Sequence, residues 1–381
     1  MRTYDIVIAG AGCAGLSLLY RLLQDPVLSR QNILVLDKRQ KNTNDRTWCY
    51  WERGEGAFES IVHRSWDRLA VCSGRMSNTL TIAPYRYKMI AGIDFYRHVL
   101  ELAAGFPNVV FRYETITNMS VHKKQVQIRT AGSAYQCSYV FNSTPLFQPR
   151  RPRSQQMHFR GWRVTTPVDC FDTQQPVLMD FRVPQQEGAA FMYVLPVGRR
   201  EALVEYTLIG SRIMKQGNYL SVIENYLSNV LGIATYDVTG EESGVLPLSC
   251  RYHARHYHRR IVHIGIAAGC LKPGSGYAFQ FIQRQCDEVL ALLRNNMFPV
   301  TKKRLLYGRF RWYDATLLRV VRNRNISFAD MMETLFTRVP APRILKFLEN
   351  STSFREECTI MRVFPPSVFV PAALKELINC K

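Results

Sequence analysis

The chain has 381 residues, of which 47% are hydrophobic and 21% are charged, and its formal net charge is +20. This composition excludes a disordered protein, and the length predicts two domains or one domain with a large insertion. The longest apolar stretch, at residues 261–271, is about half as long as a bilayer-spanning helix, and no basic-then-apolar leader precedes Tyr4, so we expect no secretory signal. Ten cysteines without a C-x-x-C pair or zinc-like spacing favour free thiols in a reducing cytoplasm and predict no metal site.

Residues 1–40 are predicted to form a strand, a glycine-rich turn, a helix and a second strand. The turn carries a G-x-G-x-x-G pattern whose members are Gly10, Gly12 and Gly15. In such a unit the first glycine permits a tight turn, the second lets the backbone approach a pyrophosphate, and the third lets the helix pack on the strand. The helix N-terminus favours phosphate, and Asp37, at the end of the second strand, is placed to bind a ribose hydroxyl. We therefore predict a Rossmann-type α/β domain that binds a dinucleotide.

Beyond residue 40, the pattern predicts strands, a return to the nucleotide domain and then a helical tail. The expected elements are a structured loop at 45–53, strands within 66–90, a helix at 94–104 capped by Asp94, a strand and hairpin region at 108–140, a crossover at 148–163, an antiparallel sheet within 160–250, a strand at 262–265, a helix at 278–294, and helices within 305–380 that prolines 340, 342, 365 and 366 interrupt. These elements predict a discontinuous nucleotide-binding domain at residues 1–150 and 251–300, an inserted antiparallel-sheet domain at 151–250, and a helical C-terminal region at 301–381.

A second glycine-containing segment lies near residue 270. It contains Gly265, Gly269, Gly274 and Gly276, followed by Tyr277. A two-domain flavoprotein needs such a segment to bring backbone close to the ribityl chain and the isoalloxazine ring, while the N-terminal glycines hold the ADP half. No second Rossmann fingerprint is present for NADPH, so we expect any such reductant to bind without a domain of its own.

Positive charge gathers late in the chain. Residues 302–324 carry eight Lys and Arg against Asp314 alone, interleaved with apolar residues. This mixture suits a surface that rests on anionic lipid, although a merely basic surface is the alternative. No helix-turn-helix, RNP or zinc-finger pattern appears, so we expect no nucleic-acid partner. We expect a cytoplasmic protein associated peripherally with the inner face of the cell membrane.

Several segments together resemble one known family. They are N-D-R-T-W-C-Y-W at 44–51, F-R-G-W at 159–162, M-D-F-R at 179–182, Y-V-L-P at 193–196, A-L-V-E-Y-T at 202–207, E-E-S-G-V-L-P at 241–247, and K-P-G-S-G-Y-A-F at 272–279. The set closely resembles the flavin-dependent lycopene β-cyclases of bacteria, over nearly the whole chain. The resemblance implies conversion of the linear ψ ends of lycopene, or of other acyclic carotenoids, into β-ionone rings, by way of γ-carotene to β-carotene. It also implies a requirement for reduced FAD, with NADPH as reductant, although no net electrons move.

The resemblance assigns roles to particular side chains. Glu205, in a hydrophobic strand, is the expected acid that protonates a terminal double bond, because burial keeps a carboxyl group protonated. Glu242, with its neighbour Glu241, is the second acidic candidate. Aromatic side chains are expected to stabilise the cation through their π faces: Trp48, Tyr50, Trp51, Phe159, Trp162 and Tyr277. Arg46 and Lys272 are expected to neutralise phosphate or flavin charge.

The residues by themselves leave alternatives open. Glu205 on a half-buried strand can face solvent, Glu241 and Glu242 can be loop carboxylates, and each aromatic can be an ordinary core residue. The chain departs from the family in having Gly274-Ser275 where a Ser-Thr pair is usual, and Tyr206 where some members have a second acid. Three rival functions remain: another FAD-dependent monooxygenase or prenyl reductase, a lipid-binding module without catalysis, and a nucleic-acid binder driven by charge. The sequence does not separate β from ε ring formation, or cyclisation of one end from that of two.

Overall fold

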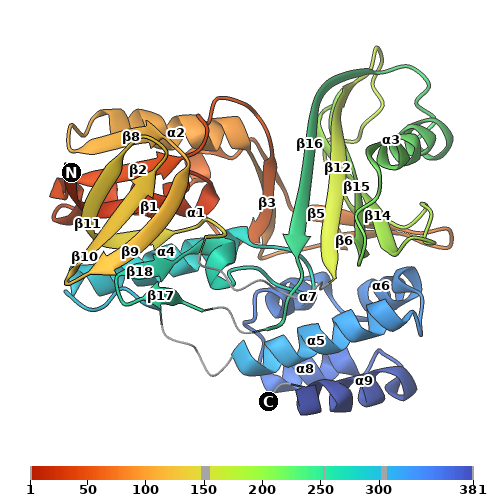
Figure 1. The fold of residues 1–381 in the computed structure, drawn as a ribbon. Helices are drawn as coiled ribbons and strands as arrows, with labels where there is room; N and C mark the ends of the chain where they lie inside the picture. Colours follow the sequence, from red (N-terminus) through yellow and green to blue (C-terminus); the bar gives the residue numbers. More distant parts are fainter. Residues whose placement is uncertain (1, 147–154, 252–253, 302–306, 380–381) are drawn as a thin grey trace.

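The computed structural model describes residues 2–146, 155–251, 254–301 and 307–379. It contains a nucleotide-binding domain, an upright antiparallel sheet beside it, and a group of helices beneath that sheet (Figure 1). This arrangement confirms the predicted α/β fold with an antiparallel-sheet region and a helical C-terminal part. Within the described residues, no helix is both long enough and apolar enough to cross a bilayer.

The nucleotide-binding domain is built on a sheet with the strand order β17-β18-β11-β1-β2-β8, to which β9 and β10 add a hairpin on β11. The strands are β1 Arg2–Ala9, β2 Ile33–Asp37, β8 Val109–Tyr113, β9 Ile116–His122, β10 Gln125–Thr130, β11 Ala134–Asn142, β17 His256–His258 and β18 Ile261–His263. Strands β18, β11, β1, β2 and β8 run parallel, and the inner strands read as unbroken apolar runs because both of their faces are covered. Helices α1 (Cys13–Gln24), α2 (Gly92–Ala104) and α4 (Phe279–Arg294) cover the sheet. The predicted first unit and the return at residues 262–265 are confirmed.

The second sheet has the order β16-β12-β15-β14-β13-β5-β6. Its strands are β5 Arg68–Cys72, β6 Ser77–Thr81, β12 Gln156–Thr165, β13 Val177–Asp180, β14 Ala189–Gly198, β15 Glu201–Gly210 and β16 Asp237–Pro247. One face packs on α3 (Gln216–Asn225), and the other faces the nucleotide domain and the C-terminal helices (Figure 1). The predicted boundaries are wrong in one respect, because β5 and β6 come from the first 150 residues. They join this sheet because β13 pairs with β5, which gives β13 a second partner.

Three local predictions need correction. Residues 45–53 are not a loop: Thr47–Glu52 forms β3, which pairs with β7 (Arg86–Ala91), and β7 also pairs with β4 (Arg64–Trp66). The helix expected from Asp94 begins at Gly92 directly after β7, and no side chain caps it. The expected crossover at 148–163 ends in β12, and residues 147–154 lie outside the described part of the chain.

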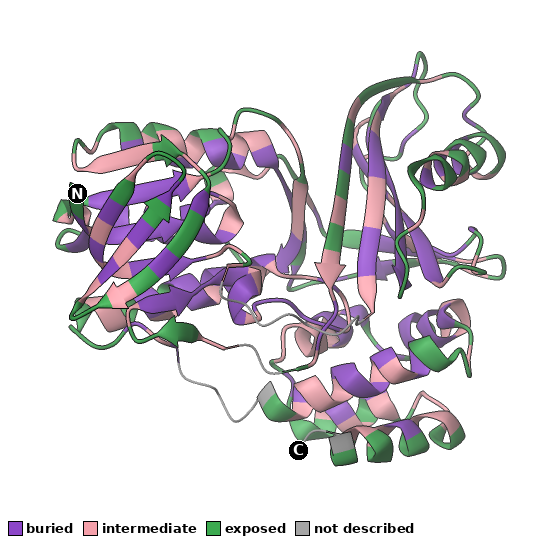
Figure 2. Cartoon of the chain, viewed as in Figure 1, coloured by how far each residue is buried: buried purple, intermediate pink, exposed green. Residues whose placement is uncertain are grey.

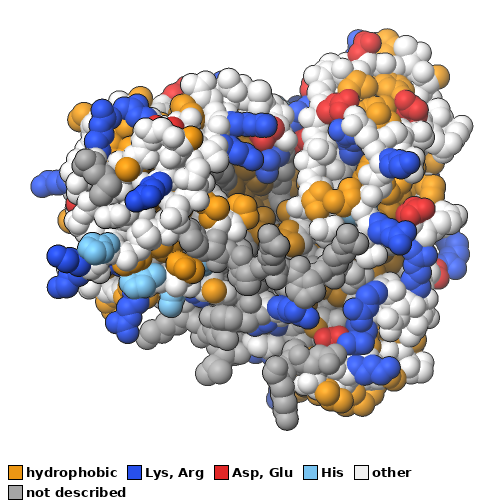
Figure 3. Space-filling model, viewed as in Figure 1, with side chains coloured by type: hydrophobic (Ala, Val, Ile, Leu, Met, Phe, Trp, Pro, Cys, Tyr) orange, Lys and Arg blue, Asp and Glu red, His pale blue; other side chains and the backbone are white. Residues whose placement is uncertain are grey.

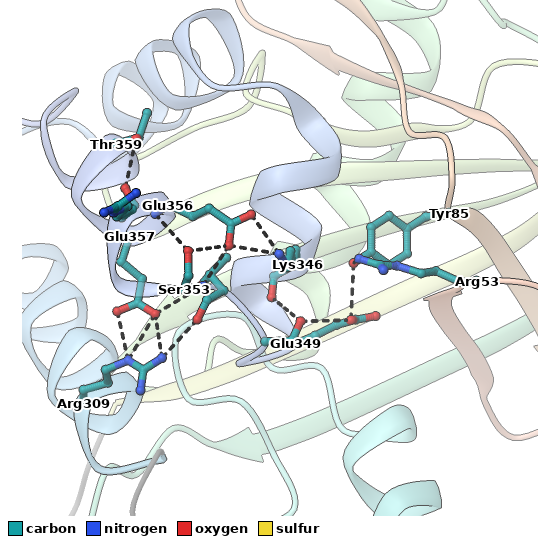
Figure 4. Close-up of polar contacts among 12 residues, drawn as sticks. Arg53, Tyr85, Arg309, Lys346, Glu349, Ser353, Glu356, Glu357 and Thr359 are labelled. Atoms are coloured by element: carbon teal, nitrogen blue, oxygen red, sulfur yellow. Dashed lines mark hydrogen bonds and ion pairs between the residues drawn. The ribbon is translucent and has the colours of Figure 1, made fainter.

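The C-terminal region is helical as predicted. It contains α5 Tyr307–Asn323, α6 Phe328–Arg338, α7 Ala341–Leu348, α8 Phe354–Met361 and α9 Pro366–Asn379. Pro340 precedes α7 and Pro366 begins α9, whereas Pro342 lies in the first turn of α7, where a missing N–H costs little. Polar contacts join these helices: Arg309 of α5 binds Glu357 of α8, and Lys346 of α7 binds Glu356 of α8 (Figure 4).

The apolar residues of the basic segment face the protein interior. On α5, Phe310, Leu318, Val320 and Val321 are buried, and the last three belong to one hydrophobic cluster with residues of the second sheet and of α6 and α7 (Figure 2). The described part of this mixture of basic and apolar residues is thus an amphipathic helix, α5, packed on a core. The apolar part of the expected lipid contact is wrong for α5, and residues 302–306 lie outside the described part of the chain.

A buried ion pair fastens α5 to the loop at residues 270–278. The Lys272 Nζ atom lies 2.8 Å from Oδ1 of Asp314, and the two side chains are 0% and 4% exposed. The same ammonium group lies 5.4 Å and 5.2 Å from the ring centroids of Phe310 and Phe347. Asp314 also accepts a hydrogen bond from the backbone of Gly274. The loop at residues 270–278 and α5 are therefore held together by a buried ion pair.

Lys272→Met is expected to lower the free energy of unfolding by about 3–5 kcal/mol, because it leaves the Asp314 carboxylate buried without the cation that it pairs with. The double variant Lys272→Met with Asp314→Leu is expected to recover most of this loss, since no charge is then buried. Urea unfolding followed by tryptophan fluorescence measures both. A single variant as stable as the unchanged protein would contradict the structural role of the pair.

Candidate active site

A cavity of about 620 Å³ lies at the edge of the nucleotide-binding sheet. Its walls come from the glycine turn, the end of β2, β3 and the start of α4, and include Gly10, Gly12, Asp37, Arg46 and Gly276. The cavity runs from the α1 N-terminus to the loop before α4. It therefore connects the two glycine-containing segments that the sequence placed about 250 residues apart.

The first three glycines have the geometry that their spacing predicts. Gly10 has φ +101°, and a Cβ atom at Gly15 would lie 1.8 Å from the Gly10 carbonyl oxygen, so neither position admits another residue without a shift. A Cβ at Gly12 would meet no atom within 4 Å. Gly12 is also the N-cap residue of α1 and offers no capping side chain. The open space and the uncapped N–H groups suit a phosphate group.

Two charged residues of the cavity wall already have partners. Asp37 Oδ2 accepts the Ala11 N–H at 2.7 Å and lies 3.5 Å from Lys41 Nζ. The bond to Ala11 fixes the carboxylate beside the glycine turn. Arg46 lines the same cavity, and its side chain is half exposed and paired with Asp45 at 3.1 Å. Both residues thus lie where the sequence predicts them, on the cavity wall.

The residues of the second glycine-containing segment lie in different surroundings. Gly276, with φ +75°, lines the 620 Å³ cavity. Gly265 and Gly269 have φ +66° and +81°, and a Cβ at Gly265 would lie 2.5 Å from Ala14 Cβ, so Gly265 permits close packing on α1. Gly274 lies against Asp314, and Lys272 is buried with the same residue. The predicted contact of Lys272 and Gly274 with the cofactor is therefore wrong, because the chain turns at Gly276 and directs them toward α5.

Two carboxyl groups meet across one glycine of the second sheet. In β12, Gly161 pairs with Glu205 of β15 on one side and with Glu242 of β16 on the other. A Cβ at Gly161 would lie 3.0 Å from Glu205 Cβ, so the absence of a side chain there leaves room for both carboxyl groups. Glu205 and Glu242 hydrogen-bond to each other, and both are buried. The sequence predicted both residues for the site, and the register brings them together.

The two carboxyl groups have different partners. Glu242 Oε2 accepts hydrogen bonds from the Arg163 guanidinium at 2.9 Å and the Thr47 hydroxyl at 2.6 Å. Glu205 Oε1 accepts only the Thr207 hydroxyl, at 3.0 Å, among the described side chains apart from Glu242. A cation therefore lies beside one member of the pair and not beside the other.

This asymmetry decides which group keeps the proton. Burial, and then the negative charge of Glu242, raises the pKa of Glu205 well above its usual value of 4.5. Burial also raises the pKa of Glu242, but the Thr47 hydroxyl and the Arg163 guanidinium offset part of this rise. At neutral pH the arrangement therefore favours a protonated Glu205 next to an ionised Glu242.

Alternation along the strands excludes four residues from the site. Trp162 lies in the core under α3, on the opposite face of β12 from Gly161. Tyr206 lies in the same core beside Glu205, and Arg160 and Glu241 form an ion pair away from the acids. The prediction of Trp162 as a substrate-binding residue is therefore wrong, because successive strand residues point to opposite faces.

Three tyrosine hydroxyl groups converge next to the acids. Tyr277 lies 3.1 Å from Tyr87 and 3.4 Å from Tyr193, oxygen to oxygen. Burial raises the pKa of Tyr277 to about 12, so its phenol is neutral. Trp51 packs edge-to-face on Tyr277, with ring centroids 4.5 Å apart, whereas Trp48 lines the 620 Å³ cavity against Phe95.

Sequence reasoning missed several residues of this site. They are Thr47, Tyr87, Arg163, Tyr193 and Thr207. Arg163 and Thr207 lie two residues from Gly161 and Glu205, so strand alternation could have placed them on the same face. Tyr193 lies opposite Glu205 on the neighbouring strand β14, within a segment that carries the family resemblance, whereas Tyr87 lies on a strand far away in the sequence.

Two further cavities meet the first one at Tyr277. A small cavity of about 120 Å³ contains the acids and the tyrosines. An apolar cavity of about 580 Å³ lies between the second sheet and the C-terminal helices, and its walls include Trp51, Phe191, Leu317, Phe347 and Phe369. Tyr277 lines all three cavities, and Ser275 and Met157 line both the small and the apolar one. The acid pair therefore lies between the nucleotide cavity and the apolar cavity of the C-terminal helices.

Comparisons with known proteins show the family to which the chain belongs. Lycopene beta-cyclase of Pantoea ananas is 25% identical, covering 99% of this chain and 98% of that protein. Lycopene beta-cyclase of Pseudescherichia vulneris is 21% identical, covering 95% and 94%. A flavoprotein/dehydrogenase structure from Cytophaga hutchinsonii shares the fold, with a TM-score of 0.66, 9% identity and coverage of 99% of this chain and 100% of that one. A family model described as lycopene cyclase protein matches residues 5–373, and the chain therefore belongs to the lycopene cyclase family.

Proposed function

We propose that the chain is a lycopene β-cyclase that closes the ψ ends of lycopene, or of other acyclic carotenoids, to β-ionone rings without net redox change. The observation that carries the proposal is the pair Glu205 and Glu242, buried between a nucleotide cavity and an apolar cavity. An acid that stays protonated in a dry pocket is what protonation of a hydrocarbon double bond requires. The apolar cavity supplies a place for the polyene chain.

The first step is proton transfer from the Glu205 carboxyl group to the terminal double bond. The Arg163 guanidinium and the Thr47 hydroxyl hold Glu242 as an anion, so the proton that leaves is the one on Glu205. The neighbouring double bond then attacks the tertiary cation and closes the ring. Loss of one proton from the ring restores neutrality, and the carboxylate that Glu205 has become, next to Glu242, is the base within reach. One proton enters and one leaves, so the product is an isomer.

Aromatic faces surround the position where the cation forms. Tyr87, Phe159, Tyr193 and Tyr277 line the small cavity with the acids. Each aromatic face is worth about 0.5–2 kcal/mol to a nearby cation. The same rings and the neighbouring apolar side chains exclude water, which would otherwise add to the cation.

The cavity along the glycine turn fits FAD. Gly10, Gly12 and the α1 N-terminus would hold the pyrophosphate, Asp37 a ribose hydroxyl, and the backbone at Gly276 the flavin end. When bound, reduced flavin supplies negative charge that stabilises a nearby cation. NADPH is the proposed reductant. The proposed substrate dissolves in the bilayer and not in water. This solubility supports a location of the protein at the inner face of the cell membrane.

Glu205→Gln is expected to lower cyclisation at least about a hundredfold, because the amide keeps the shape of the protonated carboxyl group but has no proton to give. Lycopene-accumulating bacteria that express the variant should retain lycopene, whereas the unchanged protein should yield β-carotene. Chromatography of the extracted pigments measures the result, and flavin absorbance of the purified variant reports folding. Glu241→Gln is the matched control, since Glu241 lies on the opposite face of the sheet and should have no effect. Full activity of a folded Glu205→Gln variant would contradict the proposal.

Glu205 also predicts a pH dependence of stability. Its pKa is higher in the folded chain than in the unfolded chain, where it is 4.5, so the folded chain holds a proton that the unfolded chain releases. The free energy of unfolding should therefore fall as the pH rises from about 4.5 toward the folded pKa, by up to about 1.4 kcal/mol per pH unit. Glu205→Gln should lose this contribution to the slope and keep the contributions of the other carboxyl groups, such as Glu242. Parallel slopes in urea unfolding from acid to neutral pH would contradict a raised pKa for Glu205.

The redox-neutral reaction separates a cyclase from the rival reductase and monooxygenase functions. With the flavin reduced once under anaerobic conditions and no NADPH added, a cyclase should form many product molecules per flavin, each with the mass of the substrate. A reductase should stop after one turnover and give a product heavier by two hydrogens. Mass spectrometry of the products, counted against flavin, decides between them.

A further inference from the structure

Helix α9 carries an apolar face on the outside of the protein. Its exposed hydrophobic residues are Val370 (53% exposed), Leu374 (56%), Leu377 (52%) and Ile378 (75%). Their spacing of four, three and one residues places them on one side of a helix. In Figure 3, hydrophobic side chains gather along the lower edge of the molecule, where α9 lies in Figure 1.

The other side of α9 is fixed to the protein. The Trp312 indole N–H of α5 donates to the Ala373 carbonyl oxygen at 2.9 Å, and Arg319 of α5 forms an ion pair with Glu376. Ala372 is buried in the same hydrophobic cluster as α6 and α7. The exposed apolar face is thus held in place by the protein, and it is not a fraying end.

The same helix also forms part of the apolar cavity that ends at Tyr277. Pro366, Phe369, Val370 and Ala373 line this cavity, and Val370 is more than half exposed as well. The cavity wall and the exposed apolar face therefore meet at Val370. A hydrocarbon that leaves an apolar phase at α9 can enter the cavity without crossing water.

Basic side chains are exposed on the same group of C-terminal helices. Lys375 of α9, Arg362 at the end of α8, and Arg322 at the end of α5 are exposed. Figure 3 shows Lys and Arg side chains directly above the hydrophobic edge, and the chain as a whole has a net charge of +20. An apolar strip beside cations complements an anionic lipid surface, where acyl chains meet the strip and head groups meet the cations.

We propose that the exposed face of α9 docks on an anionic bilayer and that substrate enters the apolar cavity beside Val370. This inference rests on the proposed function for the identity of the substrate, and it moves the lipid contact from the 302–324 segment to α9. A second copy of the chain is the rival occupant of the face.

Flotation of the full chain with vesicles tests the docking itself. The double variant Leu374→Ser with Ile378→Ser should reduce binding to vesicles of phosphatidylcholine and phosphatidylglycerol by about tenfold or more, which is about 1.4 kcal/mol. The matched control is Val27→Ser with Ile213→Ser, at positions 68% and 54% exposed elsewhere on the surface, and it should bind as the unchanged protein does. Vesicles of phosphatidylcholine alone should bind the unchanged protein more weakly. Unchanged flotation of the α9 variant would overturn the proposal, as would a loss of self-association with no loss of vesicle binding.

Activity measured in two media separates this inference from the proposed function. With lycopene in liposomes, the α9 variant should lose activity in step with binding, whereas with lycopene in detergent micelles it should keep the activity of the unchanged protein. A variant equally impaired in both media would show that α9 shapes the site and does not dock. If the unchanged protein floats through α9 but never cyclises lycopene, the docking surface stands and the proposed function fails.

Discussion

Two carboxyl groups are buried on either side of a single glycine, and the surrounding structure must stabilise both of them. Burial of Glu205 and Glu242 together is costly unless one of them keeps a proton, because two buried charges of the same sign repel each other. Arg163 and Thr47 stabilise the charge on Glu242 and so assign the proton to Glu205. Three adjacent strands are needed to hold this arrangement, with Gly161 on the middle one. The second sheet therefore holds one protonated carboxyl group in a buried site.

Tyr277 and the loop around it connect the acid pair to the nucleotide cavity and to the apolar cavity. The turn at Gly276 lets one loop face the nucleotide cavity, the acids and the apolar cavity in succession. Lys272 and Asp314 then fix the loop to α5, which also forms part of the wall of the apolar cavity. A nucleotide-bound group, an acid and a long apolar chain can thus meet at one place.

Local sequence signals predicted those parts of the fold that depend on residues close together in the sequence. The spacing of Gly10, Gly12 and Gly15 fixes a turn and a close approach, and the structure shows both. Glu205 and Glu242 were found through resemblance, but their meeting depends on strand register, which no local pattern reveals. Trp162 was assigned wrongly because alternation along β12 was not applied to it, and Lys272 because its partner lies in α5, 42 residues away. Tyr87 and Tyr193 come from separate strands, so only the folded chain brings them to Tyr277.

The proposed reaction depends on a Glu205 side chain that holds a proton at neutral pH. Infrared spectroscopy of the purified protein measures this directly, because a protonated carboxyl group in an apolar site has a C=O stretch separate from that of carboxylates. A band of this kind is expected at neutral pH, and it should disappear in Glu205→Gln and persist in Glu241→Gln. A spectrum without a protonated carboxyl band at neutral pH, or a band unaffected by Glu205→Gln, would contradict a protonated Glu205.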